Sequence, residues 1–353
     1  ETRRHDLDNL RGLVVLLVVG YHVLYLFNSV GVISNLDVGG IPRMDLPLYW
    51  VYPWFMCLLF VVAGISASFS LRRRSPKEFL KERTRKLLLP SVAGIFLLGW
   101  LPGWVTDQSV GIFGGQAVPG PVRFLVYCLM GIGPLWFLHE LFLASVLLLL
   151  LRGLDRKGRL SRFCQKPRPL VFPLLFFAVW GSSYLLNTPL ITVYRNGIYL
   201  LMFFLGHYLF SQEWVAAFLC RWRVPLGAAA VLLGAAYGAF FYGQDYPSAA
   251  CLTHPFTNLY LWVMILALLG GARRWLDVTG RFWGFLGSRS FGIYLLHYPV
   301  MVGVAFFLTH SGSLPMAAVY GLVLILTLAI TLPLNELLRR TPILRFLLLG
   351  IKK

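Results

Sequence analysis

The sequence predicts an all-α, polytopic membrane protein with about ten transmembrane helices and cytoplasmic N- and C-termini. Of its 353 residues, 58% are hydrophobic and 13% are charged, and its mean hydropathy of +0.71 is far above that of a soluble domain of this size. Apolar stretches of about 20 residues, enough to cross the hydrocarbon core of a bilayer, recur along the chain. Lys and Arg gather in alternate connecting segments. These observations predict a single membrane domain over residues 1–353.

The first five spans are placed by apolar runs and by the basic residues that end them. Arg11 opens the first run, the basic segment 72–86 separates the second from the third, and the basic segment 152–168 follows the fourth. Basic residues mark the cytoplasmic side of a span. The expected spans are 11–28, 47–71, 87–106, 132–151 and 170–187.

The last five spans follow the same criteria. Arg195 precedes one run, basic residues at 221–223 and 273–289 flank the next ones, and 339–353 is basic again. Shorter runs can span if flanking residues snorkel or the bilayer thins. The expected spans are 195–211, 225–243, 255–271, 285–308 and 316–338.

The charge distribution sets the orientation and excludes a nucleic-acid protein. With a cytoplasmic N-terminus, every basic residue except Arg43, Arg123 and Arg195 falls on the inner side. The net charge of +18 is thus explained by topology, since a nucleic-acid surface needs a basic patch on a soluble core. The five cysteines are odd in number and lack paired spacing, so they indicate packing residues and neither a metal site nor a disulfide framework.

Two ionisable residues in the first span call for an explanation. Arg11 and His22 are eleven residues apart, so they share one helix face and are separated by roughly 16 Å along the axis. Arg11 can equally be a snorkelling anchor paired with Asp8. His22 can equally be a packing histidine bonded to a neighbouring helix, but the shared face favours a joint role.

Four strings, "LDNLRGLVVLLVVGYH", "ERTRKLLLP", "GPLWFLHELF" and "SFGIYLLHYPV", follow one another between residue 3 and about residue 340, and in this order they resemble the acyltransferase family 3 membrane proteins. "LDNLRGLVVLLVVGYH" is similar to the family's first helix, with its Arg, ten intervening residues and His. "ERTRKLLLP" resembles the basic entry to the third helix, where Arg83 and Lys86 occupy the two cationic places. "GPLWFLHELF" is similar to the WFL segment and "SFGIYLLHYPV" to the late helix with its Tyr and His. Lys86 departs from the more usual Arg, and a Lys cannot make a bidentate phosphate contact.

The resemblance implies an acyl-CoA-dependent O-acyltransferase of the bacterial cytoplasmic membrane. Such proteins transfer an acyl group, commonly acetyl, from cytoplasmic acyl-CoA to a hydroxyl of an extracytoplasmic glycan or lipid-linked sugar. Acyl-CoA is a donor substrate, and no permanently bound cofactor or metal is expected. Arg11, Arg83, Arg85 and Lys86 would bind the anionic end of the donor. His22, with an unperturbed pKa of about 6.5, suits removal of the acceptor's proton.

Three further positions complete the expected site. His297, near an irregular backbone at Pro299, and Glu140, as an acid that orients a histidine, are the other catalytic candidates. Each residue has an alternative, non-catalytic role: His297 can be a polar packing residue at a kink, and Glu140 can be a neutral acid hydrogen-bonded to a helix. Substrate contacts are expected from Trp136, His139 and Tyr294, and the sequence does not decide whether His139 or Glu140 faces the site.

A transporter is the alternative from another functional class. In a proton-coupled transporter or flippase for a glycan or an acyl metabolite, a buried His and Glu would carry protons. Transporters of common design show paired, broken repeats, which this sequence lacks, and the cationic segment 72–86 favours a soluble anionic donor.

Overall fold

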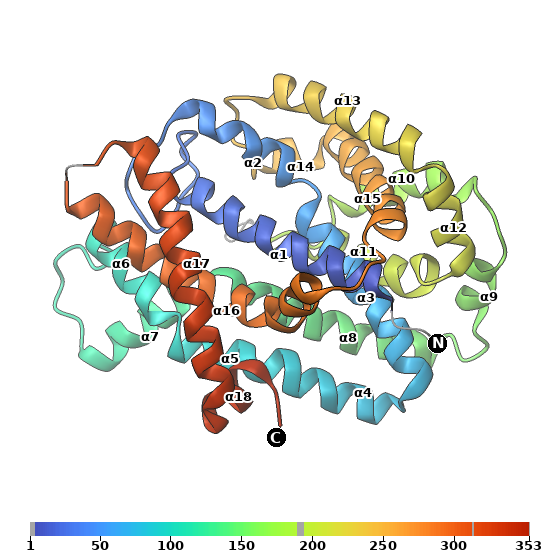
Figure 1. Ribbon diagram of the computed structural model, residues 1–353, viewed down its shortest axis with the longest axis horizontal. Helices are drawn as coiled ribbons and strands as arrows, with labels where there is room; N and C mark the ends of the chain where they lie inside the picture. The colour runs from blue at the N-terminus through green and yellow to red at the C-terminus, as the bar shows by residue number, and fades with distance from the viewer. Residues whose placement is uncertain (1–3, 189–193, 313, 353) are drawn as a thin grey trace. The chain divides into compact units, whose positions relative to one another are not determined.

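The computed structural model describes residues 4–188, 194–312 and 314–352, and within them every regular element is helical (Figure 1). Residue 3, which opens the stretch that resembles the family, lies outside the described residues. The chain forms two compact units. The first unit contains the described residues of Glu1–Val14, Leu48–Lys81 and Leu143–Gly287, and the second contains those of Val15–Pro47, Glu82–Phe142 and Ser288–Lys353.

Most helices lie within one unit. Those of the first unit are α3 (Phe55–Arg73), α9 (Arg159–Gln165), α10 (Val171–Ser182), α11 (Asn196–Leu205), η4 (Gly206–Phe210), α12 (Glu213–Arg221), α13 (Arg223–Phe241), α14 (Ala249–Thr253) and α15 (Pro255–Trp275). Those of the second unit are η1 (Pro42–Asp45), η2 (Thr84–Leu88), α5 (Leu89–Leu97), α6 (Trp100–Val110), α7 (Gly120–Met130), η3 (Gly133–Leu135), α17 (Met316–Arg340) and α18 (Pro342–Leu349). Residues of both units occur in α1 (His5–Leu26), α2 (Leu46–Val51), α4 (Pro76–Arg83), α8 (Trp136–Leu154) and α16 (Arg281–His310).

Seven helices of the described chain are long and apolar enough to cross a membrane, so the chain is a polytopic membrane protein. An eighth span results if Pro76–Leu97 and Trp100–Val110, which meet at a bend of 43°, are taken together. The seven are His5–Leu26, Pro42–Arg73, Gly133–Leu154, Arg223–Phe241, Pro255–Trp275, Arg281–His310 and Met316–Arg340.

The other two expected spans form shorter helices. The stretch 170–187 contains α10, which has only 12 residues, and at 1.5 Å per residue it rises about 18 Å, short of the roughly 30 Å hydrocarbon core. The stretch 195–211 contains α11 and η4. The count of ten spans and the cytoplasmic termini therefore stay predictions, as does the single domain. The apolar helix α7 was not expected from the sequence.

In the first unit, glycines let helices approach closely. α11 and η4 pack against α3, and a Cβ on Gly64 of α3 would come within 2.0 Å of the Phe203 carbonyl oxygen. A Cβ on Gly206 would meet the carbonyl oxygen of Val61 at 2.3 Å. Small residues at such crossings allow the backbone contact on which helix packing in membranes depends. α13 packs along α15 in the same unit (Figure 1).

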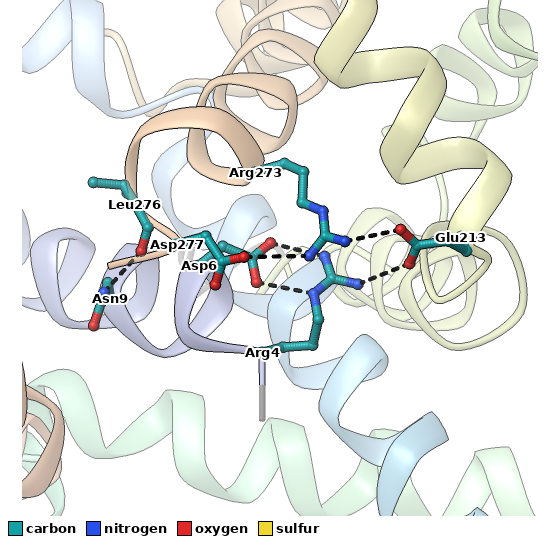
Figure 2. A network of polar contacts seen from close by, with 7 residues as sticks. All are labelled: Arg4, Asp6, Asn9, Glu213, Arg273, Leu276 and Asp277. Carbon is teal, nitrogen blue, oxygen red and sulfur yellow. Dashed lines mark hydrogen bonds and ion pairs between the residues drawn. The ribbon is translucent and has the colours of Figure 1, made fainter. Parts of the chain in front are cut away.

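A network of ion pairs fastens the first unit at its N-terminal end. Figure 2 shows Arg4 between two carboxylates, 2.7 Å from Asp6 and 3.7 Å from Glu213. Arg273 meets the same Glu213 at 2.8 Å and Asp277 at 3.7 Å. Asp6 is 1% exposed, and its hydrogen bond raises the pKa of Arg4. Each charged group in the network faces an opposite charge, so the cluster is electrostatically satisfied.

Two turns are wider than α-helical turns. η2 at Thr84–Leu88 and η4 at Gly206–Phe210 are π-helical. Such turns are rare and occur often at functional sites, because the wider hydrogen-bond ring displaces side chains from the usual α-helical positions. The first carries the basic residues Arg85 and Lys86 and the second carries His207.

Candidate functional site

Arg11 and His22 lie on one uninterrupted helix. α1 runs from His5 to Leu26, so the two residues share a face at the spacing expected from the sequence. The Arg11 guanidinium meets the Asp8 carboxylate at 3.1 Å, and both side chains are partly exposed. The anchor pair that the sequence offered as an alternative for Arg11 therefore forms.

His22 meets His297 within the second unit. The Nε2 atom of His297 lies 3.1 Å from Nδ1 of His22, and the ring centroids are 5.1 Å apart. His297 is fully buried, whereas His22 is partly exposed. The two residues are 275 positions apart, so tertiary packing alone brings them together.

Backbone carbonyls define the tautomers of both histidines. Nδ1 of His22 lies 2.9 Å from the Val18 carbonyl oxygen, and Nδ1 of His297 lies 3.0 Å from that of Ile293. A carbonyl can only accept, so we assign a proton to each Nδ1. The His22 Nδ1–H is then shared between the Val18 carbonyl and Nε2 of His297, which accepts.

This assignment leaves one ring nitrogen available. In neutral His22 the Nε2 atom carries a lone pair, and it makes no hydrogen bond to any residue that the structure describes. The Nε2 atom of His22 is also not one of the fully enclosed polar atoms that lack a hydrogen-bond partner. A lone pair of this kind can accept a proton, and the acceptor Nε2 of His297 would stabilise the resulting imidazolium.

Tyr298 and Asn35 extend the cluster. The Tyr298 ring packs edge-on against His22 with 5.0 Å between centroids, and its hydroxyl donates to the Asn35 side-chain oxygen. The Asn35 amide in turn donates to the Thr106 hydroxyl at 2.8 Å. Sequence reasoning missed Tyr298 and Asn35. Tyr298 directly follows His297 and could have been found from that adjacency, whereas nothing in the loop sequence around Asn35 singles it out.

The WFL segment supports the same helix. The Tyr294 hydroxyl donates to the Pro134 carbonyl at 2.7 Å, and a Cβ on Gly133 (φ +47°) would lie 2.6 Å from the Tyr298 ring. Tyr294 and Trp136 are both buried. The two motifs at 133–142 and 290–300 are thus packed together, and the hydroxyl expected to touch substrate is engaged by the backbone.

α16 is continuous through Pro299, so the expectation of an irregular backbone near His297 is wrong. Proline has no N–H to donate to the carbonyl four residues earlier, which is that of Leu295. A neighbouring helix can make up such a loss and keep the helix intact.

Glu140 and His139 face different surroundings. His139 Nδ1 lies 3.2 Å from the hydroxyl of Ser91 in α5. Glu140 is 6% exposed, and within the described chain it makes no hydrogen bond or ion pair, with either histidine of the pair or otherwise. No hydrogen bond or ion pair joins Glu140 to His22 among the described residues, and the assignment of Glu140 as the orienting acid stays a prediction.

The basic residues of the third-helix entry lie in and beside the π-helical turn η2. Lys86 forms an ion pair of 2.7 Å with Glu82, whereas the buried Nε of Arg85 has no partner among the described residues. Arg83 directly precedes the turn. Gly350 lies against this backbone, since a Cβ there would be 2.4 Å from the Arg85 carbonyl oxygen. The turn is therefore held by the end of α18.

No group of three or more His, Cys, Asp or Glu side chains in the described residues could hold a metal ion. The five cysteines are free.

Comparison with known proteins gives one family and a set of distant relatives. A profile described as an acyltransferase domain, that of acyltransferase family 3, matches residues 4–336. Glucans biosynthesis protein C of Escherichia coli O1:K1 is 24% identical over 99% of this chain and 94% of its own length. The proteins of that name from Shigella boydii serotype 4 and Salmonella paratyphi B are each 23% identical over 99% of the chain and 94% and 95% of their own lengths. No solved structure matches the chain significantly.

Proposed function

Because the chain belongs to acyltransferase family 3, we propose that it is a membrane O-acyltransferase that uses cytoplasmic acyl-CoA as donor. The acyl group, with acetyl as the first to test, goes to a hydroxyl of an extracytoplasmic carbohydrate. The name of the E. coli relative, glucans biosynthesis protein C, supports a glucan or related glycan as the acceptor class. The location proposed is the bacterial cytoplasmic membrane.

The observation that carries the proposal is the open Nε2 of His22, on a ring held at Nδ1 by His297 and Val18. In the proposed step, Nε2 removes the proton of the acceptor hydroxyl while its oxygen attacks the thioester carbonyl. The new ester C–O bond forms, the C–S bond breaks, and the CoA thiolate leaves with the proton that His22 has held. The hydroxyl becomes a nucleophile only when its proton is taken, which is the part a histidine performs well near neutral pH.

The donor's charged end is assigned to the basic residues of the same family motifs. Arg85 and Lys86 lie in the π-helical turn η2 and Arg83 directly precedes it, and Arg11 lies roughly 16 Å along α1 from His22. Phosphate oxygens bind guanidinium groups through short, charge-assisted hydrogen bonds. The pantetheine arm of CoA would cover the remaining distance to the histidine.

The test is acyl transfer by the purified full chain in detergent. Acetyl-CoA labelled in the acetyl group is supplied with a glucan acceptor, and CoA release and labelled glucan are both measured. The proposal expects the two in equal amounts. A protein that moves labelled material across vesicles without releasing CoA would be a transporter, and the proposal would be wrong.

A further inference from the structure

A polar cavity lies entirely within the first unit. Its volume is about 570 Å³, within the range of small-molecule sites. It is lined by the end of α3, the end of α8, the segment that leads into α9, and the π-helical turn η4. None of its lining residues belongs to the family motifs or to the histidine pair.

The cavity is electropositive. Three arginines line it, Arg72, Arg152 and Arg156, against one carboxylate, that of Asp155. This carboxylate already accepts hydrogen bonds from the backbone N–H groups of Arg159 and Leu160, at 2.8 and 2.9 Å. The acid is therefore occupied by the start of α9, and the residues that line the cavity carry three positive charges against one negative charge.

Two buried polar atoms at the cavity wall lack partners. His207 and Tyr208 are 7% and 8% exposed, and neither Nδ1 of His207 nor the Tyr208 hydroxyl makes a hydrogen bond to a described residue. Buried polar groups without partners are uncommon in folded proteins, because each costs the free energy of its lost hydration. Both residues line the cavity, so a ligand oxygen there would supply the missing partner once either side chain turns toward it.

His207 differs from three other histidines within helices in this respect. His22, His297 and His310 each place Nδ1 against the carbonyl four residues earlier, which is how a packing histidine is satisfied. At His207 the turn is π-helical, and its own carbonyl is taken by the Ser211 hydroxyl at 2.6 Å. A packing role for His207 would leave its Nδ1 without a hydrogen-bond partner among the described residues.

We propose that this cavity binds a phosphate group. Arginine guanidinium groups and a tyrosine hydroxyl donate to phosphate oxygens, and a ring N–H at His207 Nδ1 would add a further donor. The phosphate can belong to a soluble diphosphate or to the headgroup of an anionic phospholipid, because Arg72 and the segment 152–168 lie on the side predicted to face the cytoplasm. Binding at this site does not depend on acyl transfer.

The test measures binding to the purified full chain in a neutral detergent, with inorganic pyrophosphate as the soluble probe and no acyl donor. A second arm uses nanodiscs of phosphatidylcholine with and without phosphatidylglycerol, and native mass spectrometry counts retained anionic lipid. The variant R152Q/R156Q removes two cavity charges. R159Q is the matched control, because Arg159 is exposed on the same segment, does not line the cavity, and keeps its backbone bond to Asp155.

We expect R152Q/R156Q to lose at least tenfold in affinity for one of the two probes, and R159Q to bind as the wild type does. Pyrophosphate binding would identify a soluble ligand, and retained phosphatidylglycerol would identify a lipid headgroup. A second variant, H207F, keeps a ring in the turn and should also weaken binding; its melting temperature shows whether it folds. Absence of binding in both arms, or binding unchanged in the folded double variant, would overturn the proposal.

Discussion

The ion-pair network of the first unit and the histidine pair of the second satisfy their polar groups in opposite ways. In the network, Arg4 and Arg273 face three carboxylates, so every charge has a partner (Figure 2). In the pair, both hydrogen bonds that His22 makes to described residues are at Nδ1, and its Nε2 makes none to them. A saturated cluster can only hold helices together. An unsaturated one retains the capacity to exchange a proton, at some cost in stability.

Replacement of His22 is expected to give the largest effect. Without its Nε2 lone pair, H22A should lose about 10²- to 10⁴-fold in acyl transfer, the usual contribution of general-base catalysis. Its stability should fall by only about 0.5 to 2 kcal/mol, as for other hydrogen bonds inside membranes. Transfer rate and melting temperature are measured on one preparation.

H310A is the matched control for this prediction, because His310 makes the same bond to a carbonyl four residues earlier and is exposed. It should leave transfer unchanged. If folded H22A transferred acyl groups at a near-normal rate, His22 would belong with the saturated clusters.

His297 is expected to act through His22. H297A removes the acceptor that stabilises the His22 imidazolium, a charge-assisted bond worth about 1.5 to 3 kcal/mol, which corresponds to roughly 10- to 150-fold in rate. H297Q places an amide oxygen that can still accept from Nδ1, so it should recover part of the rate. Equal losses in both variants would indicate a packing role alone.

Replacement of the basic residues at the π-helical turn η2 tests where the donor binds. R83A should weaken acetyl-CoA binding by about 1.5 to 3 kcal/mol through loss of a charge-assisted contact. K86A should cost less, because a Lys acts as a point charge and cannot make a bidentate phosphate contact. Calorimetric titration with acetyl-CoA measures both. Unchanged affinity in R83A would count against this placement of the donor.

Within the ion-pair network, the burial of the carboxylate that loses its partner should determine how far the free energy of unfolding falls. R4Q leaves the buried carboxylate of Asp6 without its partner and should reduce the free energy of unfolding by about 1.5 to 3 kcal/mol. R273Q breaks a pair with Glu213, whose side chain is 68% exposed, and should cost about 0 to 1 kcal/mol. Both variants should retain acyl transfer per folded molecule. Equal destabilisation by the two would show that burial of Asp6 is not the deciding factor.

Replacement of Asp155 should give the smallest effect, a change in thermal stability that depends on pH. Hydrogen bonds from the backbone N–H groups of Leu160 and Arg159 lower its pKa. Its stabilising contribution is thus complete above the unfolded value of about 3.9 and is lost as the pH falls through the lower folded value. D155N should melt below the wild type at pH 7, and the difference should shrink below about pH 4. A difference that is the same at pH 7 and pH 3 would contradict this origin.

The hydropathy of the sequence predicts the long membrane-spanning helices, but it does not predict where the short helices end. Eight of the expected spans correspond to helices that can cross a membrane when the bent pair is included, because apolar length decides this property directly. The stretch 170–187 is equally apolar, yet α10 ends at Ser182 and Leu186 has a left-handed backbone with φ +54°. Composition alone does not reveal such an ending.

The candidate site also has a part that the sequence predicts and a part that it does not. The spacing of Arg11 and His22 follows from helix geometry, so the sequence predicts it. The contact of His22 with His297 depends on the packing of segments 275 residues apart. The expected partner Glu140 bonds neither histidine, and Asn35 carries no local signal at all. Local rules place side chains along a helix, but they do not pair helices.

The π-helical turn at Thr84–Leu88 also has a consequence for how this protein can tolerate change in length. A turn of this kind accommodates one residue more than an α-helical turn, and each residue rotates a helix by about 100°. Deletion of one residue here would convert the wide turn into an α-helical turn, so the helix stays continuous and α5 keeps its orientation relative to the helix before it. Elsewhere in a helix a single-codon deletion rotates everything that follows by about 100°, whereas here it would remove only the wide turn and the side chains displaced by it.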